Sequence, residues 1–197
     1  MPDRATLDYY EKAAPRTTFD SGAAPSRDLD AFLDRLAPGA HVLELGCGGG
    51  RDAARMVERG FVIDPTDGAG ALVRKANERF GVGARAMRFD ELEAIAQYGA
   101  VWAHASLLHV PRAELPDVLV RVRHALTPQG WHYGSYKLGD AEGRCKLGRL
   151  HNFPNEELIV TAYREAGFAI EATRRWTGDG ADGTMRDWIA IIARKLV

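Results

Sequence analysis

The sequence contains few of the residues on which several classes of protein depend. Its 197 residues include only two cysteines, Cys47 and Cys145, which are too few for a disulfide framework and indicate a reducing, cytoplasmic setting. Acidic and basic residues nearly balance, giving a net charge of −1. The chain therefore lacks the positive field typical of nucleic-acid-binding proteins, and we do not expect a nucleic acid substrate.

Long apolar runs are scarce as well. No run approaches the roughly 20 residues needed to cross a bilayer, and the polar first residues lack the apolar core of a signal peptide. We find no internal repeat and no cysteine–histidine spacing typical of a metal site. With 46% apolar residues in a chain of this length, we expect one full-sized soluble domain, as a monomer or a homodimer, without membrane contact.

Helical and strand patterns alternate from about residue 28 onward. Apolar runs of strand length occur at five positions, which are 42–45, 61–66, 84–89, 99–104 and 131–137, and helical spacing recurs between them. Two further runs, 168–176 and 185–193, flank the turn sequence TGDGADG and predict an antiparallel hairpin. The alternation predicts an α/β fold with a Rossmann-like, doubly wound sheet of seven strands, mostly parallel with a C-terminal antiparallel hairpin.

The first 27 residues stand outside this alternation. We therefore divide the chain into a segment, 1–27, and a domain, 28–197. Thr6 could begin a short helix that stops before Pro15, and the adjacent aromatic residues Tyr9 and Tyr10 are unusual in a frayed tail. Residues 1–27 could therefore be a frayed tail or a segment that folds over a ligand.

The most informative segment is the glycine-rich stretch that follows the first strand. Residues 42–52 read VLELGCGGGRD, so a strand, a glycine loop and a helix follow one another. Glycine lets a ligand lie directly on the backbone, and the next helix begins with its N–H groups facing the site. In a doubly wound sheet this loop lies at the carboxyl ends of the strands, where ligands bind. The stretch predicts a nucleotide-like cofactor.

Two classes of cofactor fit a glycine loop of this kind. Counted from Gly48, the residues Gly50 and Ala53 satisfy the dinucleotide pattern G-x-G-x-x-A, which leaves an NAD-dependent oxidoreductase open. Glu44 at the end of the strand favours the other class. A carboxylate there would repel a pyrophosphate, and it suits a ligand that carries an ammonium and a sulfonium group.

Glu44, Gly46, Gly48 and Gly50 follow the pattern E/D-x-G-x-G-x-G. The chain thereby resembles the class I S-adenosylmethionine-dependent methyltransferases, and the full stretch is similar to their small-molecule, tellurite-resistance-like branch. The resemblance implies that the cofactor is S-adenosyl-L-methionine, that Glu44 binds its methionine amine, and that Gly46, Cys47 and Gly48 lie against it. It also implies an enzyme that methylates O, N, S or a metalloid oxyanion of a small-molecule substrate. A non-catalytic cofactor-binding module remains an alternative.

The resemblance places an acid at the end of the second strand, where it would bind the ribose hydroxyls. Asp67 follows Gly46 by about the expected 20 residues and is preferred to Asp64, and Gly68 would lie beneath the adenine. The dipeptide Asp64-Pro65 predicts a short or irregular second strand, because proline cannot donate to the ladder.

Further residues complete the expected cofactor site. Asp90 and Glu91 follow the third strand, and Asp90 would bond the adenine amine or cap a short helix. His104 would meet the methionine part of the cofactor through its backbone. Tyr10 would close over the cofactor, which makes 1–27 a cofactor-covering segment.

Methyl transfer depends mainly on positioning, and a general base is needed only where the acceptor carries a proton. His109 is our candidate base, with a purely structural histidine as the alternative. For the acceptor we expect Tyr136, together with Arg144 and Arg149 of the loop 138–152, and a solvated basic loop is equally open. We assign Trp102, Trp131 and Trp188 to the core.

Overall fold

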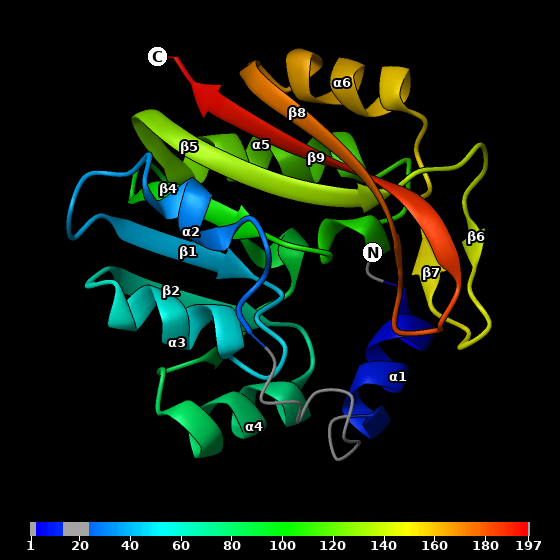
Figure 1. Ribbon diagram of the computed structural model, residues 1–197, viewed down its shortest axis with the longest axis horizontal. Helices are drawn as coiled ribbons and strands as arrows, with labels where there is room; N and C mark the ends of the chain where they lie inside the picture. Colours follow the sequence, from blue (N-terminus) through cyan, green and yellow to red (C-terminus); the bar gives the residue numbers. More distant parts are fainter. Residues whose placement is uncertain (1–2, 14–23, 197) are drawn as a thin grey trace.

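The computed structural model describes residues 3–13 and 24–196 and has a seven-stranded sheet as its central layer (Figure 1). The strands are β1 (His41–Leu45), β2 (Val62–Asp67), β3 (Arg85–Ala86), β4 (Tyr98–Ala103), β5 (Leu126–Lys137), β8 (Phe168–Asp179) and β9 (Met185–Lys195). Their order is β3-β2-β1-β4-β5-β9-β8. The first five strands are parallel, and β9 runs antiparallel to both β5 and β8. The predicted fold class is confirmed.

Helices cover both faces of the sheet because successive strand residues point to opposite sides. Val42 and Trp102 pack in one apolar cluster with α2 (Leu29–Leu33) and α3 (Arg51–Glu58). Leu43 and Val101, one residue away in sequence, pack in another cluster with α5 (Leu115–Ala125) and α6 (Glu156–Glu165). Helix α4 (Gly70–Phe80) contacts α3 and β2. This arrangement buries the parallel strands and leaves their C-terminal ends open to a ligand.

Strand β2 is more regular than we predicted from the presence of Pro65. Its pairing with β1 continues without a break from Val62 to Thr66, with Pro65 opposite Glu44. Strand β3 pairs only with Thr66 and Asp67, so Pro65 lies outside the β2–β3 ladder. The expectation of an irregular strand was therefore wrong, because Pro65 lies in the part of β2 that has no partner on its β3 side, where a proline interrupts little.

The N-terminal helix and a small second sheet lie beside the C-terminal ends of the parallel strands (Figure 1). The helix is α1 (Arg4–Ala13), and the sheet pairs β6 (Gly143–Arg144) with β7 (Leu150–His151). Within the expected segment 1–27, residues 1–2 and 14–23 lie outside the described residues. Among the helices that the structure describes, none is long and apolar enough to cross a membrane.

Candidate functional site

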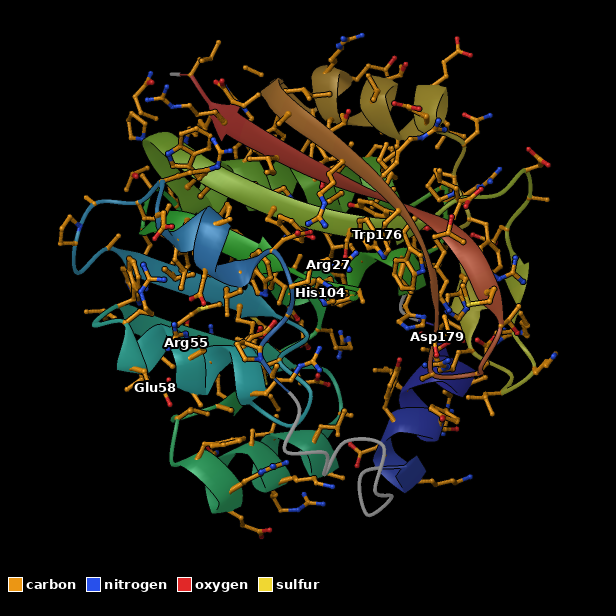
Figure 2. All side chains as sticks on the ribbon, in the orientation of Figure 1. Arg27, Arg55, Glu58, His104, Trp176 and Asp179 are labelled. Carbon is orange, nitrogen blue, oxygen red and sulfur yellow. The ribbon has the colours of Figure 1, made fainter. Side chains whose placement is uncertain are left out.

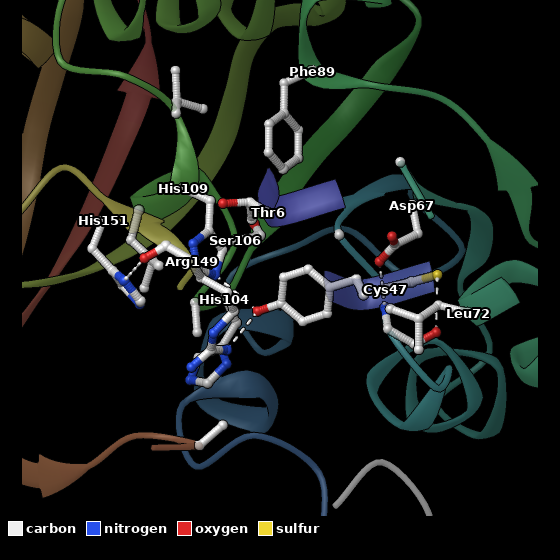
Figure 3. A pocket seen from close by; sticks show the side chains of 18 of the residues that line it. Thr6, Cys47, Asp67, Leu72, Phe89, His104, Ser106, His109, Arg149 and His151 are labelled. Carbon is white, nitrogen blue, oxygen red and sulfur yellow. Dashed lines mark hydrogen bonds between the residues drawn. The ribbon is translucent and has the colours of Figure 1, made fainter. Parts of the chain in front are cut away.

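A cavity of about 620 Å³ lies at the C-terminal ends of the parallel strands, within the size range of small-molecule sites. The loops after β1, β2 and β4 line one part of it. Helix α1, the end of β5, Arg149, His151 and the β8–β9 hairpin line another part. Figure 3 shows Cys47, Asp67 and Leu72 on one side of this cavity and His109, Arg149 and His151 on the other. The cavity therefore has two regions built from different parts of the chain.

The glycine loop after β1 directs its backbone N–H groups into the protein. The N–H groups of Gly46 and Cys47 both donate to the Thr66 carbonyl, each at 2.8 Å, and the N–H of Gly48 donates to Asp67 Oδ2 at 3.0 Å. A pyrophosphate site needs such groups free to donate to phosphate oxygens. Three loop donors are already used here, so the loop is poorly suited to a dinucleotide.

Glu44 is a buried carboxylate at the floor of the cavity. Its side chain is 4% exposed, and Oε2 has no hydrogen-bond partner within the described residues. Burial, together with the nearby Asp52 and Asp67 carboxylates, raises the pKa of Glu44 well above its usual value. An orphaned buried acceptor is costly to leave unpaired. The carboxylate is therefore matched to a cationic, hydrogen-bond-donating ligand group.

Asp67 lines the cavity and Asp64 does not. Asp67 Oδ1 accepts from the Ala69 N–H at 2.9 Å, which fixes the side chain at the strand end, and burial raises the pKa of this carboxyl to about 6. Asp64 is held by the Arg85 guanidinium through two bonds of 2.8 Å and by the Tyr98 hydroxyl at 2.5 Å. Of these two aspartates, Asp67 is the one placed to accept hydrogen bonds from hydroxyl groups of a ligand in the cavity.

The two acids after β3 have different positions. Asp90 lines the cavity, and its carboxylate accepts from Arg88 Nε at 3.1 Å. Arg88, not Asp90, is the N-cap of the 3₁₀ turn Phe89–Glu91, so the capping role expected for Asp90 was wrong. Glu91 is not among the cavity-lining residues, because its carboxylate turns back to accept from the Arg88 N–H at 2.8 Å.

Gly68 lies in the cavity wall beneath α1. A Cβ atom at this position would lie 2.9 Å from Leu7 Cδ2, so a side chain there would collide with the helix. Helix α1 is also tied to the start of α4, where the Glu11 carboxylate accepts from the N–H groups of Gly70 and Ala71 at 2.5 and 3.1 Å. Helix α1 is therefore attached directly to the N-terminal end of α4.

His104 contributes its side chain to the cavity, and not its backbone alone. The ring is parallel to that of Trp102 with centroids 5.9 Å apart, and Nδ1 lies 3.1 Å from Ser26 Oγ. Burial lowers the pKa of His104 to about 4, so the imidazole is neutral at pH 7. Asp52, which our sequence analysis missed, holds this wall together by accepting from the Trp102 indole at 3.0 Å.

The other region of the cavity contains a chain of hydrogen bonds. Arg149 Nη1 donates to the Tyr10 hydroxyl at 2.8 Å, and that hydroxyl lies 2.9 Å from His109 Nε2. His109 Nδ1 lies 2.6 Å from the Leu150 carbonyl, which can only accept, so Nδ1 carries the proton and Nε2 accepts from Tyr10. Burial and the neighbouring His151 lower the pKa of His109 well below its usual value. Tyr10 therefore stands between His109 and part of the cavity.

Two of the three residues expected to contact the acceptor lie elsewhere. Tyr136 is fully buried and bonded to the Tyr163 hydroxyl at 3.0 Å, on the face of the sheet that α5 and α6 cover. Arg144 turns outward to pair with Asp3 at 2.7 Å and does not line the cavity. Only Arg149 lies in the cavity as expected.

The strand positions that do face the cavity were missed. Lys137, the residue after Tyr136, is 3% exposed and lines the cavity, since adjacent strand residues face opposite sides. Trp188 belongs to the apolar core as predicted, but it also lines the cavity, as does Trp176 of β8. Figure 2 shows Trp176 and Asp179 near this end of the molecule, whereas Arg55 and Glu58 of α3 lie away from it. The residue pairing between β5 and β9 determines which side chains face the cavity. The sequence alone does not determine that pairing.

Comparisons with known proteins agree with this geometry. Residues 42–130 match a family model described as a methyltransferase domain. A trans-aconitate 2-methyltransferase from Deinococcus radiodurans is 29% identical over 113 residues, which are 56% of this chain and 43% of that relative. The chain thus matches less than half the length of this curated relative.

Solved structures extend the likeness in fold to nearly the whole chain. The 1,6-didemethyltoxoflavin-N1-methyltransferase of Burkholderia thailandensis, solved with that compound and S-adenosylhomocysteine, has a TM-score of 0.79 at 21% identity and covers 98% of this chain and 88% of its own. An S-adenosylmethionine-dependent methyltransferase from Methanosarcina mazei has a TM-score of 0.77 at 16% identity, over 89% and 100% of the two chains. Residues 42–130 thus form a methyltransferase domain, and nearly the whole chain has the fold of S-adenosylmethionine-dependent methyltransferases.

Proposed function

We propose that this protein binds S-adenosylmethionine in the Glu44–Asp67 region of the cavity and catalyses transfer of its methyl group to a small-molecule acceptor. The observation that carries the proposal is the orphaned Oε2 atom of Glu44, placed at the floor of a cavity that Asp67 and Asp90 also line. The bound cofactor supplies an electrophilic methyl group on a cationic sulfur. The chain's own residues bind it, orient it and place the acceptor.

The residues of the first region fit the parts of this cofactor. Glu44 would accept from the methionine ammonium, because its Oε2 is a buried carboxylate oxygen that lacks a partner among the described residues. Asp67 would accept from the ribose hydroxyls and Asp90 from the adenine amine. Gly46, Cys47 and Gly48 would lie against the cofactor, Gly68 beneath the adenine, and the wall formed by His104 beside the methionine part.

The dinucleotide alternative is disfavoured by charge and by hydrogen bonding. Glu44, Asp52 and Asp67 bring three acids to the glycine loop, and the loop N–H groups of Gly46, Cys47 and Gly48 are already bonded. A pyrophosphate would meet negative charge and few donors. The same acids favour a cofactor with two positive centres.

His109 would act through Tyr10 and not on the acceptor directly. An acceptor that carries a proton could pass it to the Tyr10 oxygen while the Tyr10 proton moves to His109 Nε2, along the 2.9 Å contact between them. The acceptor's electron pair would form the new bond to the methyl carbon as the carbon–sulfur bond breaks, leaving S-adenosylhomocysteine. An acceptor that is already unprotonated would need only the positioning.

The substrates for which two similar proteins are named support a small acceptor. One is named for trans-aconitate and another for 1,6-didemethyltoxoflavin. Helix α1 brings Tyr10 and Leu7 into the cavity wall, which supports our interpretation of 1–27 as a segment that covers the cofactor. Enclosure of this kind would exclude water from the transfer.

Isothermal titration with S-adenosylhomocysteine and, separately, with NAD tests the proposal. We expect S-adenosylhomocysteine to bind with a micromolar or lower Kd and NAD to give no heat of binding. Tight NAD binding without S-adenosylhomocysteine binding would overturn the proposal. A screen for methyl-donor consumption with small acceptors, including selenite and tellurite, then measures turnover.

A pair of matched substitutions tests the ribose site. Asp67→Asn should raise the Kd for S-adenosylhomocysteine about 10-fold or more, since loss of a charged acceptor from a buried site costs about 1–3 kcal/mol. Asp64→Asn should leave that Kd within about twofold, because Asp64 bonds Arg85 and Tyr98 outside the cavity. The reverse ranking of the two variants in the same titration would assign the ribose to Asp64.

A further inference from the structure

Arg149 holds a positive charge inside the cavity with much of its hydrogen-bonding capacity unused. The residue is 3% exposed and precedes β7 in the cavity wall. Nη1 donates to Tyr10, but Nε and Nη2 have no hydrogen-bond partner within the described residues. The Cys145 sulfur also interacts with the guanidinium, but only weakly, because sulfur is a weak acceptor. Burying a guanidinium without pairing all its donors lowers the stability of the fold. A ligand that accepts hydrogen bonds from the unpaired nitrogens would explain why such a group is buried here.

The two unpaired nitrogens lie on one edge of the guanidinium plane. The Nε–H and one Nη2–H bond point the same way in any arginine, and their spacing matches the two oxygens of a carboxylate. The guanidinium is also held from other directions, since its central carbon lies 5.0 Å from the Tyr9 ring centroid and 5.6 Å from that of Tyr10. These contacts hold the guanidinium in one orientation, so its free edge is preorganised for a ligand.

An acid near Arg149 pairs with another side chain. Asp182, the acid that Arg149 influences, lies 3.8 Å from Lys137 Nζ and pairs with that side chain. Burial, Lys137 and Arg149 lower the pKa of His151 to about 4, so this ring is neutral at pH 7. Arg149 is consequently left without a carboxylate partner among the described residues.

The walls around this charge are aromatic. Trp176 and Trp188 both line the cavity and stack on one another with centroids 5.6 Å apart and an interplanar angle of 11°. The surfaces of such rings bind flat or apolar groups by removing them from water. A bare oxyanion would use the arginine edge and leave these walls without a partner.

We infer that the acceptor is a small organic carboxylate, whose carboxylate group binds the Nε and Nη2 edge of Arg149 and whose carbon body lies against the tryptophans. This inference rests on the proposed function only in taking the methyl group from the cofactor. It gives the two ends of the cavity opposite charge preferences, with Glu44 selecting a cation and Arg149 an anion.

The experiment measures carboxylate binding to the protein saturated with S-adenosylhomocysteine, by ligand-observed NMR and thermal shift. The probes are phenylacetate, benzoate and succinate, each paired with its neutral amide, and selenite as an oxyanion without a carbon body. The variants are Arg149→Lys, which keeps the charge and loses the two-donor edge, and Arg144→Lys, the same change at an exposed position of the same hairpin.

We expect at least one carboxylate to bind more than 10-fold tighter than its amide and than selenite. Arg149→Lys should remove at least 10-fold of that affinity while the Kd for S-adenosylhomocysteine stays within twofold, and Arg144→Lys should change neither. Equal binding of acids and amides, preference for selenite, or unchanged carboxylate affinity in Arg149→Lys would overturn the inference.

The acid–amide comparison on the unaltered protein decides the inference even where Arg149→Lys fails to fold. If S-adenosylhomocysteine does not bind, the proposed function fails, and the same comparison on the protein alone still tests Arg149. The two failures are therefore distinguishable.

Discussion

Replacing Glu44 by glutamine should weaken S-adenosylhomocysteine binding by about 100-fold, the largest loss of affinity we expect from any isosteric change in this protein. Glutamine keeps the shape of the side chain and removes its charge, so the loss measures the ammonium–carboxylate interaction in a buried site, about 2–3 kcal/mol. Isothermal titration of the variant and the parent at pH 7.5 gives the ratio of the two Kd values.

The same substitution should stabilise the ligand-free protein. Because burial raises the pKa of Glu44 in the folded state, the folded state binds more protons than the unfolded state above pH 4–5, and stability falls as the pH rises through that window. The glutamine side chain has no charge to bury, so the variant's free energy of unfolding should exceed the parent's by about 0.5–2 kcal/mol at neutral pH. The advantage should shrink toward pH 4, where the parent's carboxyl is protonated in both states.

A matched control is Glu58→Gln on α3, an exposed carboxylate paired with Arg55 at 3.2 Å. It should leave the S-adenosylhomocysteine Kd unchanged, and urea titration at several pH values compares the stability of Glu44→Gln with that of the parent. Unaltered cofactor affinity in Glu44→Gln would remove Glu44 from the cofactor site and with it the main support for the proposed function.

The second large effect is expected for Gly46→Ala. Gly46 has φ of +80°, and a Cβ atom there would lie 2.5 Å from Ser106 Cβ, a separation that packed carbon atoms do not adopt. The left-handed backbone alone costs a non-glycine residue about 1–2 kcal/mol, and the collision forces the β1 loop away from the loop after β4. We expect a loss of more than about 3 kcal/mol in the free energy of unfolding and no measurable cofactor binding.

Gly60→Ala separates these two contributions. Gly60 has almost the same φ, +81°, and open space where its Cβ atom would lie. This control should therefore lose only the backbone cost of about 1–2 kcal/mol and keep full S-adenosylhomocysteine affinity. Equal unfolding midpoints for the two variants in urea would show that close approach to Ser106 does not constrain the loop.

The order of strands and helices could be predicted from the sequence because buried parallel strands are marked by local apolar runs and glycines. The third strand was predicted over 84–89 and is shorter in the structure, since β3 has only two residues, Arg85 and Ala86, and its pairing depends on the neighbouring β2. Pro65 misled the prediction for the same reason. Its effect depends on whether a strand pairs on its far side, which only the assembled sheet shows.

The cofactor residues were easier to predict than the acceptor residues. Glu44 and Asp67 follow strands directly, so their places in sequence determine their places in the cavity. The acceptor region combines α1, the end of β5 and the β8–β9 hairpin, and a change of one residue in register exchanges Tyr136 for Lys137. Arg149 was found from its charge and loop position, but the same reasoning also selected Arg144, which pairs with Asp3 and does not itself line the cavity.

The incompletely paired side chains of Glu44 and Arg149 have a consequence for the amount of protein in a cell. Each burial lowers the stability of the empty fold, and a ligand that pairs with either side chain restores it by mass action, about 2.7 kcal/mol at a concentration 100 times its Kd. Differences of this size change the fraction of chains that proteases can attack. Where cofactor and acceptor are scarce, this protein should be degraded faster, so that its abundance follows the supply of its own ligands.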